Sequence, residues 1–258
     1  MTRYWVRFRC GEKSGWGELT GDRVVPLSRP PFEGGGERGD PLPLETVRLL
    51  QPLPAPGKFI GLWNNFHQRA AEEGLTPPAH PLWFVKTANC CAGPGEVIRR
   101  PEGYAGPVAF EGELGIVVGR RCRNADREEA QAAIFGYTCV NDVTARGEMR
   151  ADPAFVQWCR AKSHDTFGPF GPVIASGLDP GDLRVRVRID GEPYQDYPVA
   201  DMIFDPVEIV RHLSRDVTLE AGDLIACGTS VGAREMPDGC RVEVEIDRIG
   251  VLVNRFGA

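Results

Sequence analysis

The feature that most constrains this sequence is an apolar run over residues 108–118 that contains two glutamates, Glu111 and Glu113. In an extended strand the two carboxylates share one face, and an apolar set takes the other: Val108, Phe110, Leu114, Ile116 and Val118. Like charges on one face repel, and their removal from water without a partner costs far too much free energy. The run therefore indicates either a divalent cation at this face or a solvated strand with two surface glutamates, and the pair alone favours neither.

Composition limits the class of protein. With 258 residues, 42% hydrophobic and 26% charged, the chain is typical of a soluble globular protein. A net charge of -6 argues against nucleic acid or an anionic membrane as the main partner. We find no secretory segment and no apolar run of membrane-spanning length, so a cytoplasmic location is expected. The eight cysteines form no CxxC pair, which indicates free and mostly buried thiols.

Strand patterns dominate the chain, and helices serve as connectors. Residues 1–50 predict a small N-terminal β-domain with a flexible Pro- and Gly-rich linker, and residues 51–258 predict the main domain. Strands of the main domain are expected at 58–63, 82–86, 95–118, 135–142, 183–199, 224–227 and 241–254. Helices are expected at 44–50, 66–74, from Asp126 onwards and at 206–213.

Asp142 ends a mostly apolar predicted strand, a position from which a carboxylate can project into a cleft. Together with Glu111 and Glu113 it would complete an all-oxygen site, which suits Mg²⁺, Mn²⁺ or Ca²⁺ better than Zn²⁺. An octahedral Mg²⁺ would leave positions for water or a bidentate substrate, which favours catalysis over a purely structural ion. Taken alone, Asp142 fits a turn residue after a strand at least as well.

Several motifs in the same order resemble the fumarylacetoacetate hydrolase family across roughly residues 57–256. They lie at Gly61, Asn65-Phe66, 81–86, 110–119, 136–146, 160–169 and Gly228-Thr229. The resemblance implies a β-rich α+β fold of the rolled β-sandwich type with a small N-terminal β-domain, and often a homodimer. It also implies Mg²⁺ or Mn²⁺ on Glu111, Glu113 and Asp142, with a small 2-oxo acid or acylpyruvate as substrate.

The same resemblance suggests roles for further residues. Lys162 would act in catalysis by holding the metal-site carboxylates or the substrate, in a setting that the aromatic residues around it indicate is buried. Thr229, Arg146 and Lys86 would bind substrate. An ordinary turn threonine and a structurally paired arginine are the alternatives for the first two.

The general base is expected on the helix over residues 66–74, where many members of the family carry a His followed three residues later by Glu. Counting from the start of this motif puts His67 at the histidine position, with Ala70 at the glutamate position. Counting back from its end puts Glu72 on the glutamate and Arg69 on the histidine. We favour His67 with Glu72, because an imidazole transfers protons near neutral pH and a guanidinium does not.

The leading hypothesis is an enzyme that uses Mg²⁺ or Mn²⁺ to cleave a small 2-oxo acid or acylpyruvate, by C–C hydrolysis or decarboxylation through a metal-stabilised enolate. Catabolism of aromatic compounds is the expected setting. One alternative is an isomerase or hydratase of a 2-hydroxydienoate such as 2-hydroxyhepta-2,4-diene-1,7-dioate. Another is a metal- and oxo-acid-binding protein without catalysis, which Ala70 suggests. His164, close to Lys162, is the reserve candidate for the base.

Overall fold

Strand β11 (Gly112–Val118) continues the acidic run and is buried along its whole length. In the computed structural model, which describes residues 1–257, it lies in a twelve-stranded sheet between β12 (Ile134–Asn141) and β17 (Leu224–Ala226). The order along this sheet is β4-β3-β2-β1-β14-β12-β11-β17-β6-β7, with β5 beside β1 and β8 beside β14. Both faces of β11 are therefore buried, including Glu113 on the face that the sequence predicted to be acidic.

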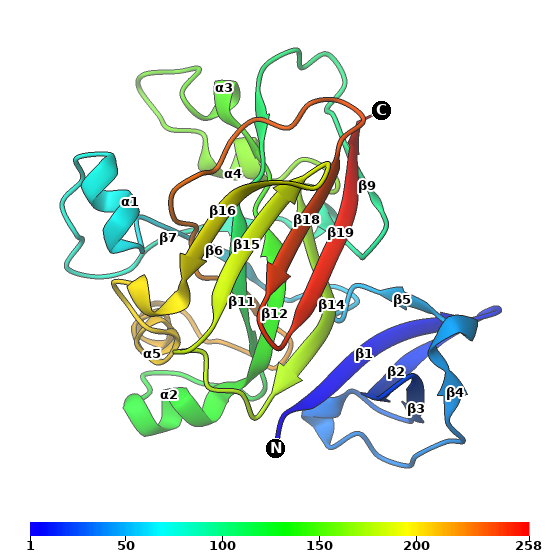
Figure 1. Cartoon of the computed structure of the whole chain (residues 1–258). Coiled ribbons are helices and arrows are strands. Elements are labelled where there is room, and N and C mark those ends of the chain that lie inside the picture. Colours follow the sequence, from blue (N-terminus) through cyan, green and yellow to red (C-terminus); the bar gives the residue numbers. More distant parts are fainter. Residues whose placement is uncertain (258) are drawn as a thin grey trace.

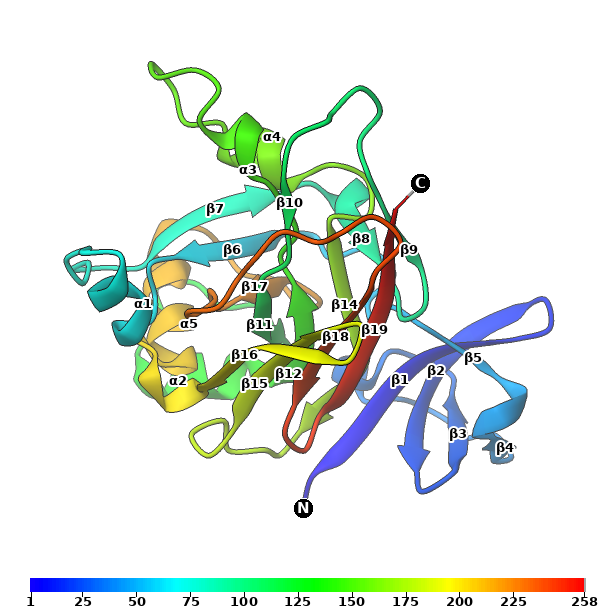
Figure 2. The same ribbon diagram turned by 45° about the horizontal axis from the view of Figure 1, so that its top comes forward.

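The remaining strands of the large sheet come from the first 92 residues of the chain and from residues 168–176 (Figures 1 and 2). Their bounds are β1 (Arg3–Cys10), β2 (Lys13–Thr20), β3 (Arg23–Leu27), β4 (Leu42–Pro43), β5 (Arg48–Leu50), β6 (Phe59–Trp63), β7 (Leu82–Lys86), β8 (Cys91–Ala92) and β14 (Gly168–Ser176). The N-terminal strands are not a separate sheet, because β1 pairs antiparallel with β14.

A five-stranded sheet packs across β11, β12 and β14, as Figure 1 shows. Its order is β16-β15-β18-β19-β9. Its strands are β9 (Val97–Arg99), β15 (Arg184–Ile189), β16 (Glu192–Pro198), β18 (Arg241–Ile246) and β19 (Gly250–Gly257). A two-stranded ladder is formed by β10 (Val108–Ala109) and β13 (Thr144–Ala145).

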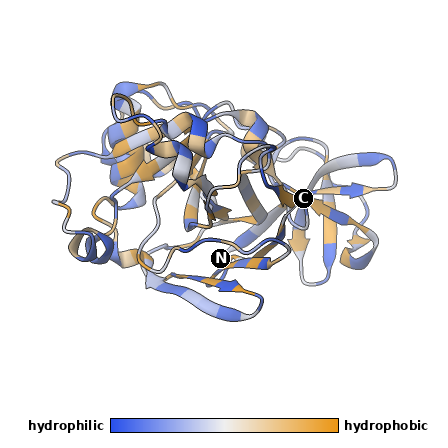
Figure 3. Cartoon of the chain, turned by 90° about the horizontal axis from the view of Figure 1, so that it is seen from above, coloured by the Kyte–Doolittle hydropathy of each residue, from blue (hydrophilic) through white to orange (hydrophobic). Residues whose placement is uncertain are grey.

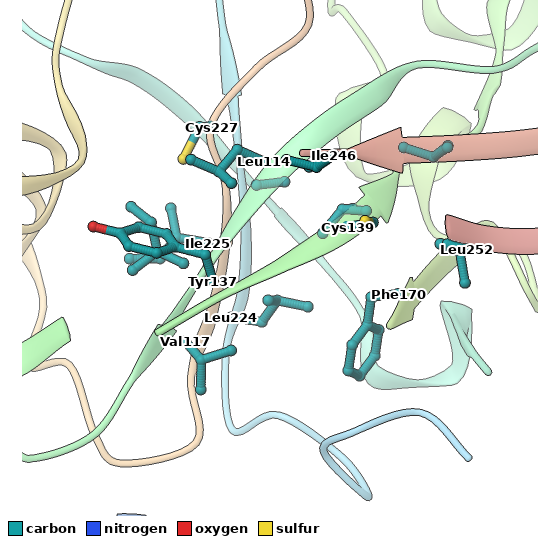
Figure 4. Close-up of a cluster of buried hydrophobic side chains, with 14 of the residues drawn as sticks. Leu114, Val117, Tyr137, Cys139, Phe170, Leu224, Ile225, Cys227, Ile246 and Leu252 are labelled. Carbon is teal, nitrogen blue, oxygen red and sulfur yellow. The ribbon is translucent and has the colours of Figure 1, made fainter. Parts of the chain in front are cut away.

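Buried side chains from six strands pack around β11, on both faces of the large sheet. Figure 4 shows Leu114 and Val117 of β11 among residues of β12, β14, β17, β18 and β19, including Tyr137, Phe170 and Leu252. All of these are buried. Figure 3 shows that hydrophilic residues are prominent in the outer loops and helices, while hydrophobic segments alternate along the strands. Such a core holds the strands, and hence the ends of β11 and β12, in one register.

The helices are short connectors at the edges of the sheets. They are α1 (His67–Glu72), α2 (Arg127–Ala133), α3 (Arg146–Met149), α4 (Trp158–Lys162) and α5 (Pro206–Asp216). Four 3₁₀ turns join them: η1 (Pro31–Glu33), η2 (Leu44–Thr46), η3 (Ala88–Cys90) and η4 (Val199–Asp201). Asp126 and Asp205 cap α2 and α5 by accepting hydrogen bonds from the first-turn backbone amides of Glu129 and Glu208.

Most predicted elements of the main domain are confirmed, including the helices at 66–74, after Asp126 and at 206–213. The hairpin expected at 183–199 turns at Asp190-Gly191, both with positive φ. The helix expected at 44–50 is wrong. Its first residues form η2 and its last form β5, since Arg48, Leu49 and Leu50 pair with β1. Helices α3 and α4 were not predicted, because each is too short for a hydrophobic period.

Two expectations from composition can also be compared with the structure. Within residues 1–257, none of the helices has the length and the apolar character that a membrane span requires. All eight cysteines are free, and five are buried: Cys90, Cys122, Cys139, Cys227 and Cys240.

The close packing of β6 on β7 generates a stability prediction at Gly61. A Cβ atom added there would lie 2.4 Å from the ring of Phe84. We expect Gly61→Ala to lower the free energy of unfolding by about 1–3 kcal/mol, the usual cost of overpacking, in urea denaturation. Gly15→Ala is the control, because its Cβ would find only ordinary contact at 4.0 Å and should cause no loss. Equal stability of the two variants would contradict the prediction.

Candidate metal centre and active site

The structure brings together the three carboxylates that were predicted to bind metal. Glu111, Glu113 and Asp142 each offer an oxygen, and these atoms lie within 4.8 Å of one another. Glu111 links β10 to β11, Glu113 lies in β11, and Asp142 follows β12. The backbone holds the spacing, because Asp142 N–H donates to the Glu111 carbonyl at 2.8 Å and Glu111 N–H donates to Asn141 Oδ1 at 3.0 Å. All three residues are at most 7% exposed.

Two buried lysines partly neutralise this cluster. Lys162 Nζ lies 2.6 Å from Glu111 Oε2 and 2.5 Å from Asp142 Oδ2. Lys86 Nζ lies 2.6 Å from Asp142 Oδ1 and donates to the Phe167 carbonyl at 3.0 Å. Three carboxylates thus face two ammonium groups, which leaves one negative charge in excess.

This excess negative charge belongs to Glu113. Burial, and then the charge of Asp142, raise the pKa of Glu113 well above its ordinary value. For Asp142 burial also acts upward, but the charges of Lys162 and Lys86 outweigh it and lower the pKa of this carboxyl. Burial lowers the pKa of Lys162, yet Asp142 and Glu111 reverse the effect and raise it. A divalent cation would supply the missing positive charge, so these oxygen donors fit Mg²⁺ or Mn²⁺.

The cluster opens into a cavity of about 980 Å³ whose wall includes Glu111, Glu113 and Lys162. Aromatic rings form the wall behind Lys162. Phe84 stacks on Trp158 with centroids 5.3 Å apart, and Lys162 Nζ lies 4.9 Å from the centre of the Phe84 ring. The ring faces hold the ammonium group in place and keep bulk water from it.

A turn after β17 closes the other side of the cluster. Gly228 N–H donates to Glu113 Oε2 at 2.8 Å. Thr229 lines the cavity, but its hydroxyl already donates to the Gly112 carbonyl at 2.9 Å and accepts from Gln195 Nε2 at 2.9 Å. Thr229 therefore fixes this turn against β11. One acceptor site of its hydroxyl oxygen remains for the expected contact with substrate.

Helix α1 points His67 away from the site. His67 is exposed and is not among the residues that line the cavity, whereas Arg69, Glu72 and Glu73 all line it. At 3.6 residues per turn, Arg69 lies roughly 200° around the helix from His67 and on the same side as the two glutamates. The placement of His67 at the active site is therefore corrected. The residues that the other register puts at the histidine and glutamate positions, Arg69 and Glu72, both line the cavity.

Arg69 connects this helix to the metal cluster. Its Nε lies 2.9 Å from Glu73 Oε1, and its Nη1 lies 3.7 Å from Glu111 Oε1. The same Nη1 donates to the Thr229 carbonyl at 3.5 Å. Glu73 is thereby occupied, and Glu72 is the carboxylate of α1 that remains available to the cavity within the described residues.

Other predicted site residues lie in different surroundings. Lys86 is 1% exposed and sits behind Asp142, outside the cavity wall, because β7 turns it into the core. There it forms an ion pair with Asp142 and does not reach the cavity. Arg146 does line the cavity. His164, the reserve base, instead pairs with Glu148 at 2.7 Å, and neither of these two lines the cavity.

The position of Arg69 generates a prediction about metal affinity. Its positive charge attracts Glu111 and opposes a cation bound to the same carboxylate. We expect Arg69→Gln to tighten Mn²⁺ binding by about tenfold in calorimetry, which corresponds to about 1.4 kcal/mol. Arg69→Lys keeps the positive charge and should tighten Mn²⁺ binding less. Unchanged or weaker Mn²⁺ binding in Arg69→Gln would rule out this charge opposition.

Glu113 generates a prediction about pH. A carboxyl whose pKa is raised on folding destabilises the folded state progressively as the pH rises above the unfolded-state value. In metal-free protein, Glu113→Gln should therefore raise Tm at pH 8 by about 2 °C or more, since 1 kcal/mol shifts Tm by roughly 2–4 °C at this size. The gain should shrink at pH 5. A gain that is independent of pH would contradict the role of the charge.

Comparisons with known proteins agree with this geometry. The family model described as fumarylacetoacetate (FAA) hydrolase C-terminal matches residues 58–257, and one described as Rv2993c-like, N-terminal, matches residues 4–52. Protein Rv2993c of Mycobacterium tuberculosis is 40% identical over 95% of this chain and 90% of its own length. Oxaloacetate tautomerase YisK of Bacillus subtilis is 34% identical over 92% of this chain and 84% of its own.

Solved structures show the same fold. A 2-hydroxyhepta-2,4-diene-1,7-dioate isomerase from Mycobacterium marinum superposes with a TM-score of 0.88 at 34% identity, covering 99% of this chain and 98% of its own. A maleylpyruvate hydrolase from a Sphingobium species, in complex with manganese(II) and pyruvate, gives a TM-score of 0.80 at 26% identity, covering 99% and 100%. The chain, with its β-rich fold and its buried cluster of three carboxylates, belongs to the fumarylacetoacetate hydrolase family.

Proposed function

We propose that the protein is a Mg²⁺- or Mn²⁺-dependent enzyme that moves a proton next to the keto group of a small 2-oxo acid, and so interconverts its keto and enol forms. The observation that carries this proposal is the cluster of Glu111, Glu113 and Asp142, which is short of one positive charge and lies at the wall of a large cavity. Hard oxygen donors of this kind suit a cation that also takes up oxygen atoms of a substrate.

The cation would polarise the keto group and stabilise the negative charge that develops on its oxygen. Around it, Lys162 holds Glu111 and Asp142 at fixed positions, and Lys86 holds Asp142 from behind. Gly228 N–H keeps Glu113 oriented. These contacts prepare the carboxylates in advance, so little reorganisation is needed when the substrate binds.

Glu72 is the proposed acid and base. It lines the cavity, and its neighbour Glu73 is engaged by Arg69. Within the described residues, histidine, cysteine and tyrosine are absent from the cavity wall. A carboxylate can remove a proton from the carbon beside a keto group and return it to another atom of the same substrate. Such a transfer requires one base and no activated water.

Cleavage, the leading expectation from the sequence, becomes the second candidate. C–C hydrolysis needs a water molecule that is activated and directed at a carbonyl group, and the histidine expected to do this is not at the site. The size of the cavity, about 980 Å³, does leave room for an acylpyruvate and a water molecule. Similarity to a maleylpyruvate hydrolase at 26% identity also supports C–C hydrolysis as the second candidate. A role in aromatic catabolism and a homodimeric state stay predictions.

A matched pair of variants on α1 tests the base. Glu72→Gln should lower turnover of oxaloacetate between keto and enol forms by about 10²-fold or more, the usual effect of losing a general base. It should retain Mn²⁺-dependent binding of oxalate, because the metal cluster is untouched. His67→Ala should keep wild-type turnover. Full activity in Glu72→Gln together with loss in His67→Ala would return the base to His67.

Proton exchange in D₂O tests the reaction class with a single substrate. If the protein forms an enol, Mn²⁺-loaded wild type should catalyse exchange of the C3 protons of pyruvate or oxaloacetate, followed by NMR. Exchange without cleavage of an acylpyruvate supports tautomerisation, whereas rapid cleavage supports hydrolysis. Metal-dependent oxalate binding without exchange or cleavage would identify a binding protein without catalysis.

A further inference from the structure

Cys90 and Cys91 are neighbours in the chain, and their thiol groups are in contact. Cys90 ends η3 and is fully buried, whereas Cys91 begins β8 and is partly exposed. The Cys91 thiol donates a hydrogen bond to Cys90 Sγ. Neither residue lines the cavity. The pair is therefore a dithiol that the proposed reaction does not use.

Cys90 packs against the lysine that lies behind the metal cluster. A Cβ atom added at Gly168 would lie 2.7 Å from Cys90 Sγ and 3.3 Å from Lys86 Cε, so the thiol and the lysine side chain pack around one glycine. Strand β8 pairs with β14 at the same place, with Cys91 beside Gly168. Lys86 Nζ in turn lies 2.6 Å from Asp142 Oδ1. A movement of Cys90 is therefore passed to Asp142 through Lys86.

A disulfide between these two residues would require a movement of this kind. Adjacent Cα atoms are about 3.8 Å apart, closer than the roughly 4.4–6.8 Å of most disulfides. In the thiol form, Cys90 N–H donates to the Thr87 carbonyl at 3.0 Å, and Cys91 N–H donates to the Ala88 carbonyl. These bonds hold both residues at the end of the 3₁₀ turn. Formation of the disulfide would open the turn and draw Cys90 Sγ away from Gly168.

We propose that Cys90 and Cys91 are a modification site for hydrogen peroxide, at which a disulfide between them displaces Lys86 from Asp142 and weakens metal binding. The inference goes beyond the proposed function, because it does not depend on which reaction the metal centre catalyses. Lys86 fixes one oxygen of Asp142. Groups that orient a metal ligand in this way commonly change metal affinity by about 10- to 100-fold when they are lost.

The oxidation consumes one peroxide molecule for each pair of thiols. The hydrogen bond from Cys91, and then the charge of Lys86, lower the pKa of Cys90 against the effect of burial, which favours a thiolate. This thiolate attacks one peroxide oxygen, so that an S–O bond forms, the O–O bond breaks and hydroxide leaves. Cys91 Sγ then attacks Cys90 Sγ, so that the S–S bond forms, the S–O bond breaks and a second hydroxide leaves. The two thiol protons convert both hydroxide ions to water: the thiols lose two electrons, and the peroxide gains two.

Mass spectrometry tests the disulfide directly. Trypsin cleaves after Lys86 and Arg99, and the peptide 87–99 contains Cys90 and Cys91 but no other cysteine. After treatment of the metal-free protein with hydrogen peroxide and then catalase, this peptide should be lighter by two hydrogen atoms and should resist alkylation. Dithiothreitol should restore two thiols that can be alkylated. Two free thiols after peroxide, or added oxygen without a disulfide, would overturn the proposal.

Calorimetry with Mn²⁺ tests the effect on the metal centre. The oxidised wild type should bind Mn²⁺ about tenfold more weakly than the reduced wild type, and reduction should restore the affinity. Cys91→Ser cannot form the disulfide and should keep the affinity of the reduced wild type before and after peroxide. Cys159→Ser is the matched control, because Cys159 is an exposed cysteine of α4 outside the pair. It should lose affinity on oxidation as the wild type does.

The remaining outcomes separate this inference from the proposed function. A disulfide that leaves Mn²⁺ affinity unchanged would overturn the link to the metal centre, and so would an equal loss of affinity in peroxide-treated Cys91→Ser. Absence of Mn²⁺ binding in the reduced wild type would overturn the proposed function and this link together. The mass of peptide 87–99 would still decide whether the disulfide forms.

Discussion

The contact on which the site depends is that of Lys162 with Glu111 and Asp142. Without this ammonium group, three buried carboxylates would face one another with only Lys86 and the more distant Arg69 as counter-charges, and burial would force protons onto them. With Lys162 present, the cluster lacks a single positive charge, at Glu113. This imbalance is small enough for the protein to fold and large enough to favour a cation. The aromatic wall of Phe84 and Trp158 and the close approach at Gly61 keep the lysine where this balance requires it.

Positive groups are arranged in two roles around the carboxylates. Lys86 and Lys162 are buried and form ion pairs with the clustered carboxylates, so they partly neutralise the charge of the cluster. Arg146 and Arg234 reach the cavity with donors to spare, and Arg69 lies close to Glu111 and to the turn at Thr229. The inner lysines stabilise carboxylates, and the outer arginines attract anions. Together they suit a ligand that is itself negatively charged.

Much of the site could be predicted from the sequence, because Glu111, Glu113 and Asp142 end or occupy regular strands whose period is visible in the chain. Lys162 followed from the family resemblance. The sequence favoured His67 over Arg69 on chemistry alone. Which of the two faces the cavity could not be predicted, since it depends on where a six-residue helix begins, and one residue turns the helix by 100°. Lys86 was expected to bind substrate because a motif does not say which face of β7 is core. Arg234 carried no signal: it meets Arg146 only through the pairing of irregular segments beside β10.

The backbone hydrogen bond from Asp142 to Glu111 limits where residues can be inserted or deleted in this protein among species. Two of the proposed metal ligands, Glu111 and Asp142, are fixed by the register of adjacent antiparallel strands, in which Gly112 pairs with Asn141. Loss or gain of one residue within either strand would move the following side chains to the opposite face. Insertions and deletions between the two ligands should therefore be confined to the connection around α2, and this prediction concerns chain length alone, whatever the substrate.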